Sequence, residues 1–423
     1  MLRYLPAILV GRLARVIIRI FRKGGGSALP GLILSKIAPG ILFKTLDSFK
    51  QGLVVVTGSA GKSTTTKMLV AIARAHGMTV FTNPSTANIL QGFYSTIIEK
   101  SASNGVSRAD IAILEMDEGH ARALTEKVQP RQVTILNVME DQLDRFVDPA
   151  LVRADLTEVA KRARDAVVLN ADDQNTVIIG EEVDSRHKYW FGLSGGVLRN
   201  AKSGLATAPT YLEPLARPKV DAEVIDSSGT DIVILQHGRS FGVALPNRGV
   251  HFALDAVAAF QSAAVLLGDK FDPQLAASTM SELPPVFARG EFVEVFGKPV
   301  EFNLVQNPGS MQLNLDALEG EPDQILFAIG RDVHDPSWLW TVDYSNLKHV
   351  SVVTGFNAAE AALVLEYHGV TYDRLIPDLE QAIDYFFNLD KPTRGIKTVL
   401  FSADAMRRMR RALGFWSPEE VSR

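Results

Sequence analysis

The chain has 423 residues, of which 46% are hydrophobic and 22% are charged. This length is too great for one ordinary core and predicts two or three globular domains. The formal net charge of −4 gives no support to nucleic-acid binding, which usually requires a concentrated basic surface. Because the sequence contains no cysteine, disulfides, thiolate metal sites and a cysteine nucleophile are excluded on this chain, and the composition fits a reducing compartment.

Residues 1–23 combine basic and apolar side chains. The cations are Arg3, Arg12, Arg15, Arg19, Arg22 and Lys23. No uncharged run approaches the ~18–20 residues of a spanning helix, and we find no cleavage site of a secretory signal. Two interpretations stay open: a helix packed on the body of the protein with its arginines in water, or a cationic amphipathic helix that also contacts an anionic membrane surface. We expect residues 1–45 to form a helical segment packed on the body.

Residues 53–66 predict a phosphate-binding loop between a strand and a helix. Glycines in the loop allow the backbone to approach an anion at the helix N-terminus. Lys62 can reach terminal phosphates, and the Ser63 hydroxyl can ligate a magnesium ion that bridges them. The predicted triphosphate-binding residues are Thr57, Gly58, Ser59, Ala60, Gly61, Lys62, Ser63 and Thr64. The motif is a shortened form, because Val56 stands where the strict pattern has glycine.

Further apolar runs predict a mostly parallel sheet covered by helices on both faces. They are residues 79–81, 111–114, 133–136 and 166–169. Ligands bind beyond the carboxyl ends of such strands, so the polar residues there are candidates. They are Glu115, Asp117, Glu118, Asn137, Asp141, Gln142, Asp144, Arg145, Asn170, Asp172 and Asp173. Carboxylates at this edge suit magnesium, and we predict Glu115 as a ligand together with Ser63. Asp172 and Asp173 are equally well interpreted as helix caps.

Several motifs together resemble a known family. The phosphate loop, Glu115, Asp141-Gln-Leu-Asp-Arg145 and Leu169-Asn-Ala-Asp-Asp173 are similar to the ATPase domain of the Mur ligases, which join amino acids to cell-wall precursors. Motifs closer to the MurT family, the synthetase subunits of lipid II isoglutaminyl synthase, extend over nearly the whole chain. They are the Gly24-to-Gly31 segment, Thr82-Asn83 with Ala87-Asn88, Glu115-Met-Asp-Glu-Gly119, Asn307-Pro-Gly309 and Asp335-Pro-Ser-Trp-Leu-Trp340.

The resemblance implies an α/β fold. A P-loop central domain with a mostly parallel sheet, residues 46–290, would be followed by a smaller Rossmann-like α/β domain, residues 291–423. Residues 190–246 are expected to form a β-rich insertion with an antiparallel meander. Many members of the family carry a four-cysteine zinc ribbon there, and without cysteine no zinc is expected.

The resemblance also implies a reaction that uses ATP and Mg²⁺. ATP would phosphorylate the α-carboxylate of D-glutamate in the lipid II peptide stem, and ammonia would attack the acyl phosphate to give D-isoglutamine. Lys62 would be catalytic, and Arg289 would contact ATP unless it is a surface hinge residue. The residues expected near the phosphates or the substrate are Asn88, Asn137, Asp141, Gln142, Asp144 and Arg145.

A partner is implied as well, a GatD-type glutaminase that supplies ammonia and forms a heterodimer with this chain. The catalytic carboxylate at that interface would be Asp335, which would act with the glutaminase's cysteine and histidine. Asp335 could instead cap a turn before Trp338, and Asp332 is a competing candidate. Because the acceptor is lipid-linked, we expect a cytoplasmic enzyme at the inner face of the cytoplasmic membrane.

Three departures from the family pattern keep other functions open. Residues 249–259 lack the two asparagines that approach the adenine in the family. The arginine that the family has just after Gly355 is Asn357 or absent, and Ser402-Ala-Asp404 stands where the family usually has Thr-Tyr-Thr. The leading hypothesis is an ATP-dependent amidating ligase. The alternatives are a Mur-type amino-acid ligase and a catalytically decayed scaffold that binds a glutaminase.

Overall fold

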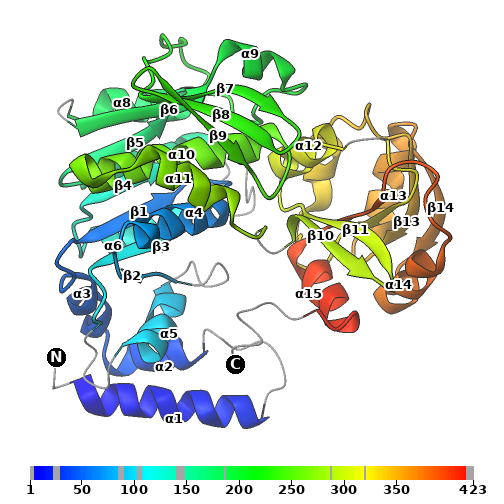
Figure 1. Cartoon of the computed structure of the whole chain (residues 1–423). Coiled ribbons are helices and arrows are strands. Elements are labelled where there is room, and N and C mark those ends of the chain that lie inside the picture. Colours follow the sequence, from blue (N-terminus) through cyan, green and yellow to red (C-terminus); the bar gives the residue numbers. More distant parts are fainter. Residues whose placement is uncertain are drawn as a thin grey trace.

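The computed structural model describes residues 4–21, 29–83, 90–101, 107–139, 148–184, 187–285, 288–318 and 321–415. Two α/β domains stand beside each other, the larger from the first two thirds of the chain and the smaller from the last third (Figure 1). Each domain is built on one sheet with helices on both faces. The predicted fold class is therefore confirmed.

The larger domain contains a nine-stranded sheet in the order β2-β3-β1-β4-β5-β6-β7-β8-β9. Its strands are β1 (Leu53–Thr57), β2 (Val80–Phe81), β3 (Ile111–Glu115), β4 (Gln132–Ile135), β5 (Ala166–Asn170), β6 (Lys188–Leu193), β7 (Ala222–Ser228), β8 (Asp231–Gln236) and β9 (Arg239–Ala244). Neighbours from β2 to β7 are parallel. Every residue of β1 is buried, as expected for a strand covered on both faces.

The meander β7-β8-β9 is antiparallel, and it extends the main sheet instead of forming a separate insertion. The start of the predicted insertion, around Trp190, lies in β6, which pairs in parallel with β5 and β7. The strands of residues 190–246 therefore form the far end of the central sheet and include the antiparallel meander.

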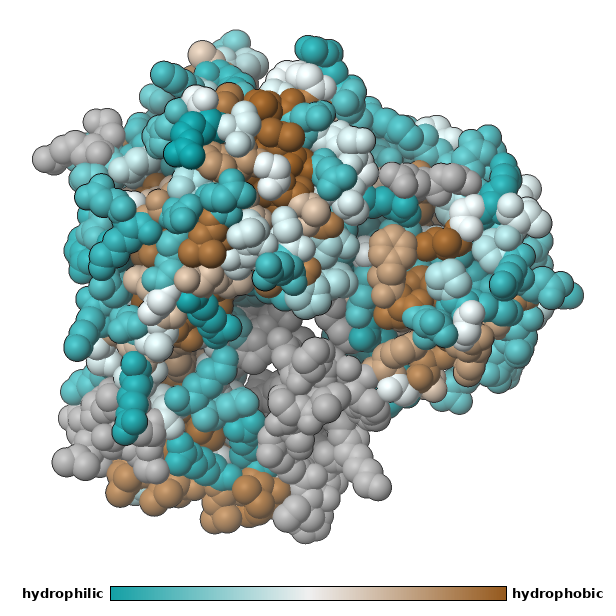
Figure 2. All heavy atoms as spheres, viewed as in Figure 1, coloured by the Kyte–Doolittle hydropathy of each residue, from teal (hydrophilic) through white to brown (hydrophobic). Residues whose placement is uncertain are grey.

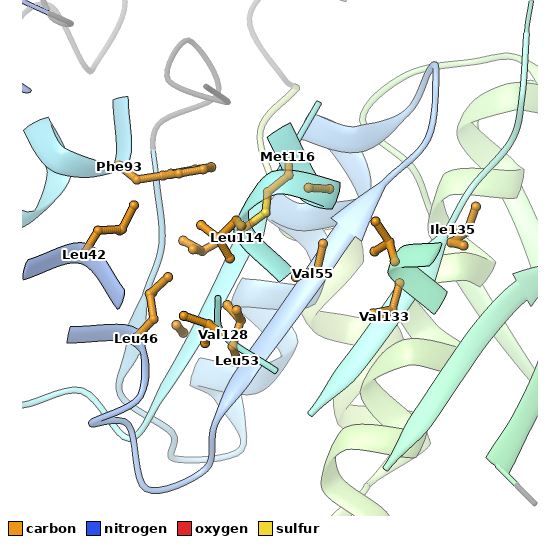
Figure 3. Packing of buried hydrophobic residues seen from close by; sticks show 14 of the residues in the cluster. Leu42, Leu46, Leu53, Val55, Phe93, Leu114, Met116, Val128, Val133 and Ile135 are labelled. Carbon is orange, nitrogen blue, oxygen red and sulfur yellow. The ribbon is translucent and has the colours of Figure 1, made fainter. Parts of the chain in front are cut away.

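Alternate residues of the strands face two separate cores. On one face lie α4 (Lys62–Ala75), α9 (Gly195–Asn200), α10 (Val250–Leu267), η3 (Gly268–Lys270) and α11 (Pro273–Ser281). The other face carries α3 (Gly40–Leu46), α5 (Leu90–Lys100), α6 (Glu118–Thr125), α7 (Pro149–Lys161) and α8 (Gln174–Glu182). Figure 3 shows this second core, where Leu42 and Phe93 come from helices and Leu53, Val55 and Leu114 from the sheet.

Helix α10 is long and apolar enough to cross a membrane by length and composition, as is the bent pair formed by α2 (Leu29–Ile37) and α3 taken together. The apolar window of α10 is 72% buried within the domain, where it packs on α4 and on the sheet. It is therefore a core helix in this fold.

The smaller domain contains a six-stranded sheet in the order β10-β11-β15-β12-β13-β14. Its elements are β10 (Arg289–Val295), β11 (Lys298–Leu304), α12 (Pro308–Asp316), β12 (Ile325–Ala328), η4 (Pro336–Thr341), β13 (His349–Thr354), α13 (Ala358–Tyr367), β14 (Thr371–Ile376), α14 (Leu379–Asn388), β15 (Lys397–Phe401) and α15 (Ala403–Ala412). All neighbours are parallel except β10 and β11.

Helix α1 (Leu5–Phe21) packs with α2 against α5. The expectation that its arginines face water is wrong for two of them. The Arg12 side chain donates to the carbonyl oxygens of Ile98 at 3.2 Å and Ser101 at 2.6 Å. Arg15 forms an ion pair with Glu99 at 3.1 Å. These cations face the protein because helix α5 offers them carbonyl and carboxylate partners.

Candidate active site

The phosphate loop connects β1 to α4 as the motif predicts. Gly58 and Gly61 have φ angles of 126° and 82°, in the region that favours glycine. A Cβ atom on Gly61 would lie 2.0 Å from an Asp255 carboxylate oxygen. The loop therefore requires glycine at position 61 for its conformation and for its contact with α10.

The side chain of Lys62 is held over this loop. Its Nζ donates to the carbonyl oxygens of Gly58 at 2.5 Å and Ser59 at 3.0 Å, and lies 3.9 Å from Glu118 Oε2. Burial raises the pKa of Glu118 to about 7, against the opposing effect of the Lys62 charge. The ammonium group thus lies where the backbone can receive a triphosphate, and bound phosphate oxygens can replace its carbonyl contacts.

Ser63 and Glu115 meet beneath the loop. The Ser63 hydroxyl donates to Glu115 Oε1 at 3.0 Å, and both side chains are buried. The Glu115 backbone is fixed by Asn83, whose amide makes two hydrogen bonds of 3.1 Å with it. The pair supplies hard oxygen ligands of the kind that Mg²⁺ prefers. Among the described residues no group of three or more His, Asp or Glu could hold a metal, so phosphate oxygens and water would have to complete the coordination.

Asn137 shapes the loop. Its Oδ1 accepts from the Ala60 backbone at 2.8 Å, its Nδ2 donates to the Ala60 carbonyl at 3.3 Å, and its own carbonyl accepts from the Ser59 amide at 3.1 Å. These contacts fix the loop backbone that would receive phosphates, and the predicted position of Asn137 near bound phosphates stays a prediction. The other residues predicted for this region, Asn88, Asp141, Gln142, Asp144 and Arg145, lie outside the described residues.

Three further acidic residues at the strand ends make hydrogen bonds within the fold. Asp117 caps α6, and Asp173 caps α8 while also accepting from the Val138 backbone at 2.7 Å. Asp172 accepts from Arg217 at 2.6 Å and from the Leu193 backbone at 2.6 Å. The cap interpretation therefore holds for Asp173, whereas Asp172 anchors the segment around Arg217.

A cavity of about 420 Å³ opens between the two domains. Its central-domain wall contains the phosphate loop, Glu115 and Asn137. The opposite wall comes from the smaller domain and includes residues of α12 and α15, such as Asn314 and Arg407. A volume of this size matches small-molecule sites, and a position between domains is typical of them.

One end of the cavity is formed by the start of α10 and by Arg289. Burial lowers the pKa of His251 to about 4, and the positive charge of Arg289 acts in the same direction. Burial also raises the pKa of Asp255, against Arg289 and hydrogen bonds from Thr65 and Thr64. Arg289 thus lies in the cavity wall, where an ATP contact was predicted, at the first residue of β10.

Sequence reasoning noted the missing asparagines near Gly249 but overlooked His251 and Asp255. Both line the cavity, and His251 Nδ1 is buried without a hydrogen-bond partner among the described atoms. The available signal was their spacing of four residues on an otherwise apolar helix, which places both on one face.

Asp335 and Asp332 differ in environment. Asp335 is exposed, caps η4 by accepting from the Ser337 amide at 2.9 Å, and has its pKa lowered by hydrogen bonds from Ser337. Asp332 accepts from the Ser402 hydroxyl at 2.6 Å and from the first backbone amides of α15. Asp335 is therefore both a cap and a surface carboxylate, whereas Asp332 is committed to holding α15.

The fold is that of the Mur-type ligases. MurF from Acinetobacter baumannii superposes with a TM-score of 0.68 at 18% identity, covering 91% of this chain and 80% of that one. MurF ligase from Thermotoga maritima, solved in complex with ADP, gives a TM-score of 0.64 at 19% identity, covering 92% and 84%. Identities this low show a shared fold.

Two family models and several curated relatives match the sequence. Residues 56–263 match the Mur ligase middle domain and residues 304–402 match the MurT ligase C-terminal domain. The MurT subunit of lipid II isoglutaminyl synthase (glutamine-hydrolyzing) from Streptococcus pneumoniae is 24% identical over 419 residues, 90% of this chain and 91% of that protein. The Staphylococcus aureus MurT subunit is 30% identical over 172 residues, 41% and 38% of the two chains. The chain is thus similar to MurT subunits over nearly its whole length, which confirms the predicted resemblance.

Proposed function

We propose that this chain is the synthetase subunit of a lipid II isoglutaminyl synthase. The observation that carries the proposal is the interdomain cavity, which has a phosphate loop on one wall and a MurT-type C-terminal domain on the other. This arrangement is suited to bringing a triphosphate and a second substrate together as the domains close.

The proposed reaction has two steps. An oxygen of the D-glutamate α-carboxylate attacks the γ-phosphorus of ATP, and the bond to ADP breaks. The nitrogen of ammonia then attacks the acyl carbon, phosphate leaves with the bonding electron pair, and the nitrogen loses a proton to give the amide. Phosphorylation is needed because a carboxylate is a poor electrophile.

The residues of the site support these steps. Lys62 can neutralise charge on the transferring phosphoryl group, and such electrostatic stabilisation supplies most of the catalysis in phosphoryl transfer. Ser63 and Glu115 would hold Mg²⁺, which offsets the charge of the triphosphate. Arg407, on the opposite wall of the cavity, provides a cation for an anionic acceptor.

The ammonia would come from a GatD-type glutaminase in a cytoplasmic heterodimer. This chain has no cysteine to hydrolyse glutamine by the usual thiolate route. We expect the carboxylate of Asp335, which is exposed, to orient a histidine of such a partner.

Amidation of a lipid II-type acceptor tests the proposal. With ATP and Mg²⁺, the purified chain should amidate the acceptor when ammonium chloride is supplied, and glutamine should replace ammonium only when the glutaminase is present. Activity with an amino-acid cosubstrate and no partner would support the amino-acid ligase instead. Failure with both nitrogen sources, together with failure to bind ATP, would leave the scaffold hypothesis.

A further inference from the structure

Helix α1 presents an exposed apolar stripe. The exposed fractions are 50% for Leu9, 45% for Val10, 61% for Leu13, 54% for Val16 and 46% for Ile17. The spacing of these residues places them along one side of the helix. Figure 2 shows hydrophobic side chains gathered along the edge of the molecule that α1 forms in Figure 1. We call these five residues the α1 stripe.

The opposite side of α1 fixes this orientation. Tyr4, Ala7 and Ile8 are buried, and a Cβ atom on Gly11 would lie 2.8 Å from Ile98 Cδ1, so that α1 approaches α5 closely. Arg12 and Arg15 bind carbonyl and carboxylate oxygens of the same region. A helix that only covered the body would bury its apolar side and expose its arginines. In α1 the five apolar residues of the α1 stripe are exposed instead, and Arg12 and Arg15 contact the protein.

Helix α2, which packs against α1, also has exposed apolar side chains. Leu29 and Leu32 are each 36% exposed, and Ile37 is 53% exposed. Helix α1 itself has 17 residues, corresponding to a rod of roughly 25 Å. This surface is suited to lying along a flat apolar boundary, and α1 is too short and too charged for a span.

The positive charge of residues 1–23 indicates what kind of apolar boundary this surface contacts. Residues 1–23 contain six arginines and lysines and no aspartate or glutamate, and four of the six, Arg3, Arg19, Arg22 and Lys23, are additional to the Arg12 and Arg15 that contact α5 and its end. Such a segment is attracted to anionic lipid headgroups within about a Debye length of roughly 10 Å. We propose that α1 lies in the headgroup region of an anionic bilayer, with the α1 stripe directed toward the acyl chains. The proposed lipid-linked acceptor, which rests on the function proposed above, would then reach the enzyme along the same surface.

Vesicle flotation tests this inference on the full chain. Wild type should float with vesicles of phosphatidylcholine and phosphatidylglycerol, more weakly with phosphatidylcholine alone, and less as salt rises. A variant combining Leu13→Asp and Val16→Asp should lose vesicle partitioning by about tenfold or more, because charged groups resist burial in the acyl boundary.

The matched control combines Leu151→Asp and Leu363→Asp, which are 55% and 53% exposed on helices α7 and α13. This control should float like wild type, and circular dichroism should show that both variants are folded. Equal flotation of the two variants, or no flotation of wild type, would overturn the proposal. So would loss of self-association or of glutaminase binding in the α1 variant without loss of vesicle binding, because the stripe would then be a protein contact.

The assay measures binding and requires no turnover, so failure of the proposed function leaves its outcome unchanged. Amidation of a water-soluble, short-chain acceptor should be the same for wild type and the α1 variant. A defect with that acceptor would show that the substitutions act on the catalytic body and not on lipid binding.

Discussion

At the scale of single residues, Lys62 is the centre of the site. Its ammonium group lies between two loop carbonyls and the buried carboxylate of Glu118. These contacts hold the charge over the loop without a ligand. A triphosphate would bring several negative oxygens to the same place, so the site offers a positioned charge at little cost of rearrangement.

Replacing Lys62 with alanine should reduce ATP turnover by about a hundredfold or more, because the transferring phosphoryl group loses its positioned cation. Production of ADP in the presence of acceptor and ammonium measures the effect. Lys161→Ala is the control, since Lys161 forms a surface ion pair with Glu182 at 3.0 Å. Comparable turnover in the two variants would contradict the role given to Lys62.

Glu118 should make stability depend on pH. Its pKa in the fold is about 7, raised from 4.5. Protonated Glu118 therefore contributes to the free energy of unfolding fully below about pH 4.5, and this contribution is lost as pH rises through about 7. Glu118→Gln stays neutral. Relative to wild type, its free energy of unfolding should therefore increase between about pH 5 and about pH 8, by roughly 1–3 kcal/mol.

Urea unfolding at a series of pH values measures this difference. Glu126→Gln, at an exposed glutamate just beyond α6, is the matched control and should follow the wild-type pH dependence. If the stability of the Glu118→Gln variant changes in parallel with wild type across this range, ionisation of the Glu118 carboxyl group does not lower the stability of the fold.

At the scale of elements, helix caps connect the strands to the site. Asp173 accepts from the Asn175 amide at 2.8 Å at the start of α8 and from the Val138 amide at 2.7 Å beyond β4. It thereby ties α8 to the segment that follows Asn137. Asp148 caps α7 through the Ala150 amide at 2.8 Å and is exposed.

Asp173→Ala should lower the free energy of unfolding by about 2–4 kcal/mol, because it removes a cap and leaves a buried amide unpaired. Asp148→Ala should cost only about 1 kcal/mol, since water can replace the exposed cap. Chemical denaturation of both variants measures the difference. Equal losses would mean that the bond to Val138 contributes nothing to stability.

Local patterns in the sequence predicted the elements that carry the phosphate chemistry. The strand before the loop, the helix from Lys62 and the strand ending at Glu115 all follow from short-range periodicity and motif spacing. The continuation of the sheet through β6 and β7 could not be predicted that way, because it depends on pairing between distant segments. The orientation of Arg12 and Arg15 on α1 could not be predicted either, since it depends on partners in and just after α5.

At the scale of the whole molecule, the departures from the family pattern have structural roles. Asn357 donates to the carbonyl oxygens of Gly330 at 3.0 Å and Val333 at 2.9 Å. Ser402 accepts from the Gly330 amide at 2.8 Å and donates to Asp332. Both brace the segment that leads to Asp335. These hydrogen bonds could not be predicted from the sequence, because the bonded residues lie far apart in it.

The surface position of Asp335 leads to a prediction for the heterodimer. Asp335→Asn should reduce glutamine-driven amidation by about tenfold or more, because a histidine of the partner would lose the carboxylate that orients it. Ammonium-driven amidation should stay near the wild-type rate. Asp343→Asn, at another exposed aspartate of the same domain, is the control. A parallel loss with both nitrogen sources would place the defect in the ligase site itself.

The central claim is that the interdomain cavity activates a carboxylate as an acyl phosphate. The most direct measurement uses an acceptor in which both oxygens of the D-glutamate α-carboxylate are a heavy isotope, with ATP, Mg²⁺ and ammonium chloride. The account predicts that each amide formed releases one phosphate that contains the heavy isotope, as detected by mass spectrometry or phosphorus NMR. Amide formation with only unlabelled phosphate would contradict it, because the carboxylate oxygen would not have become bonded to phosphorus.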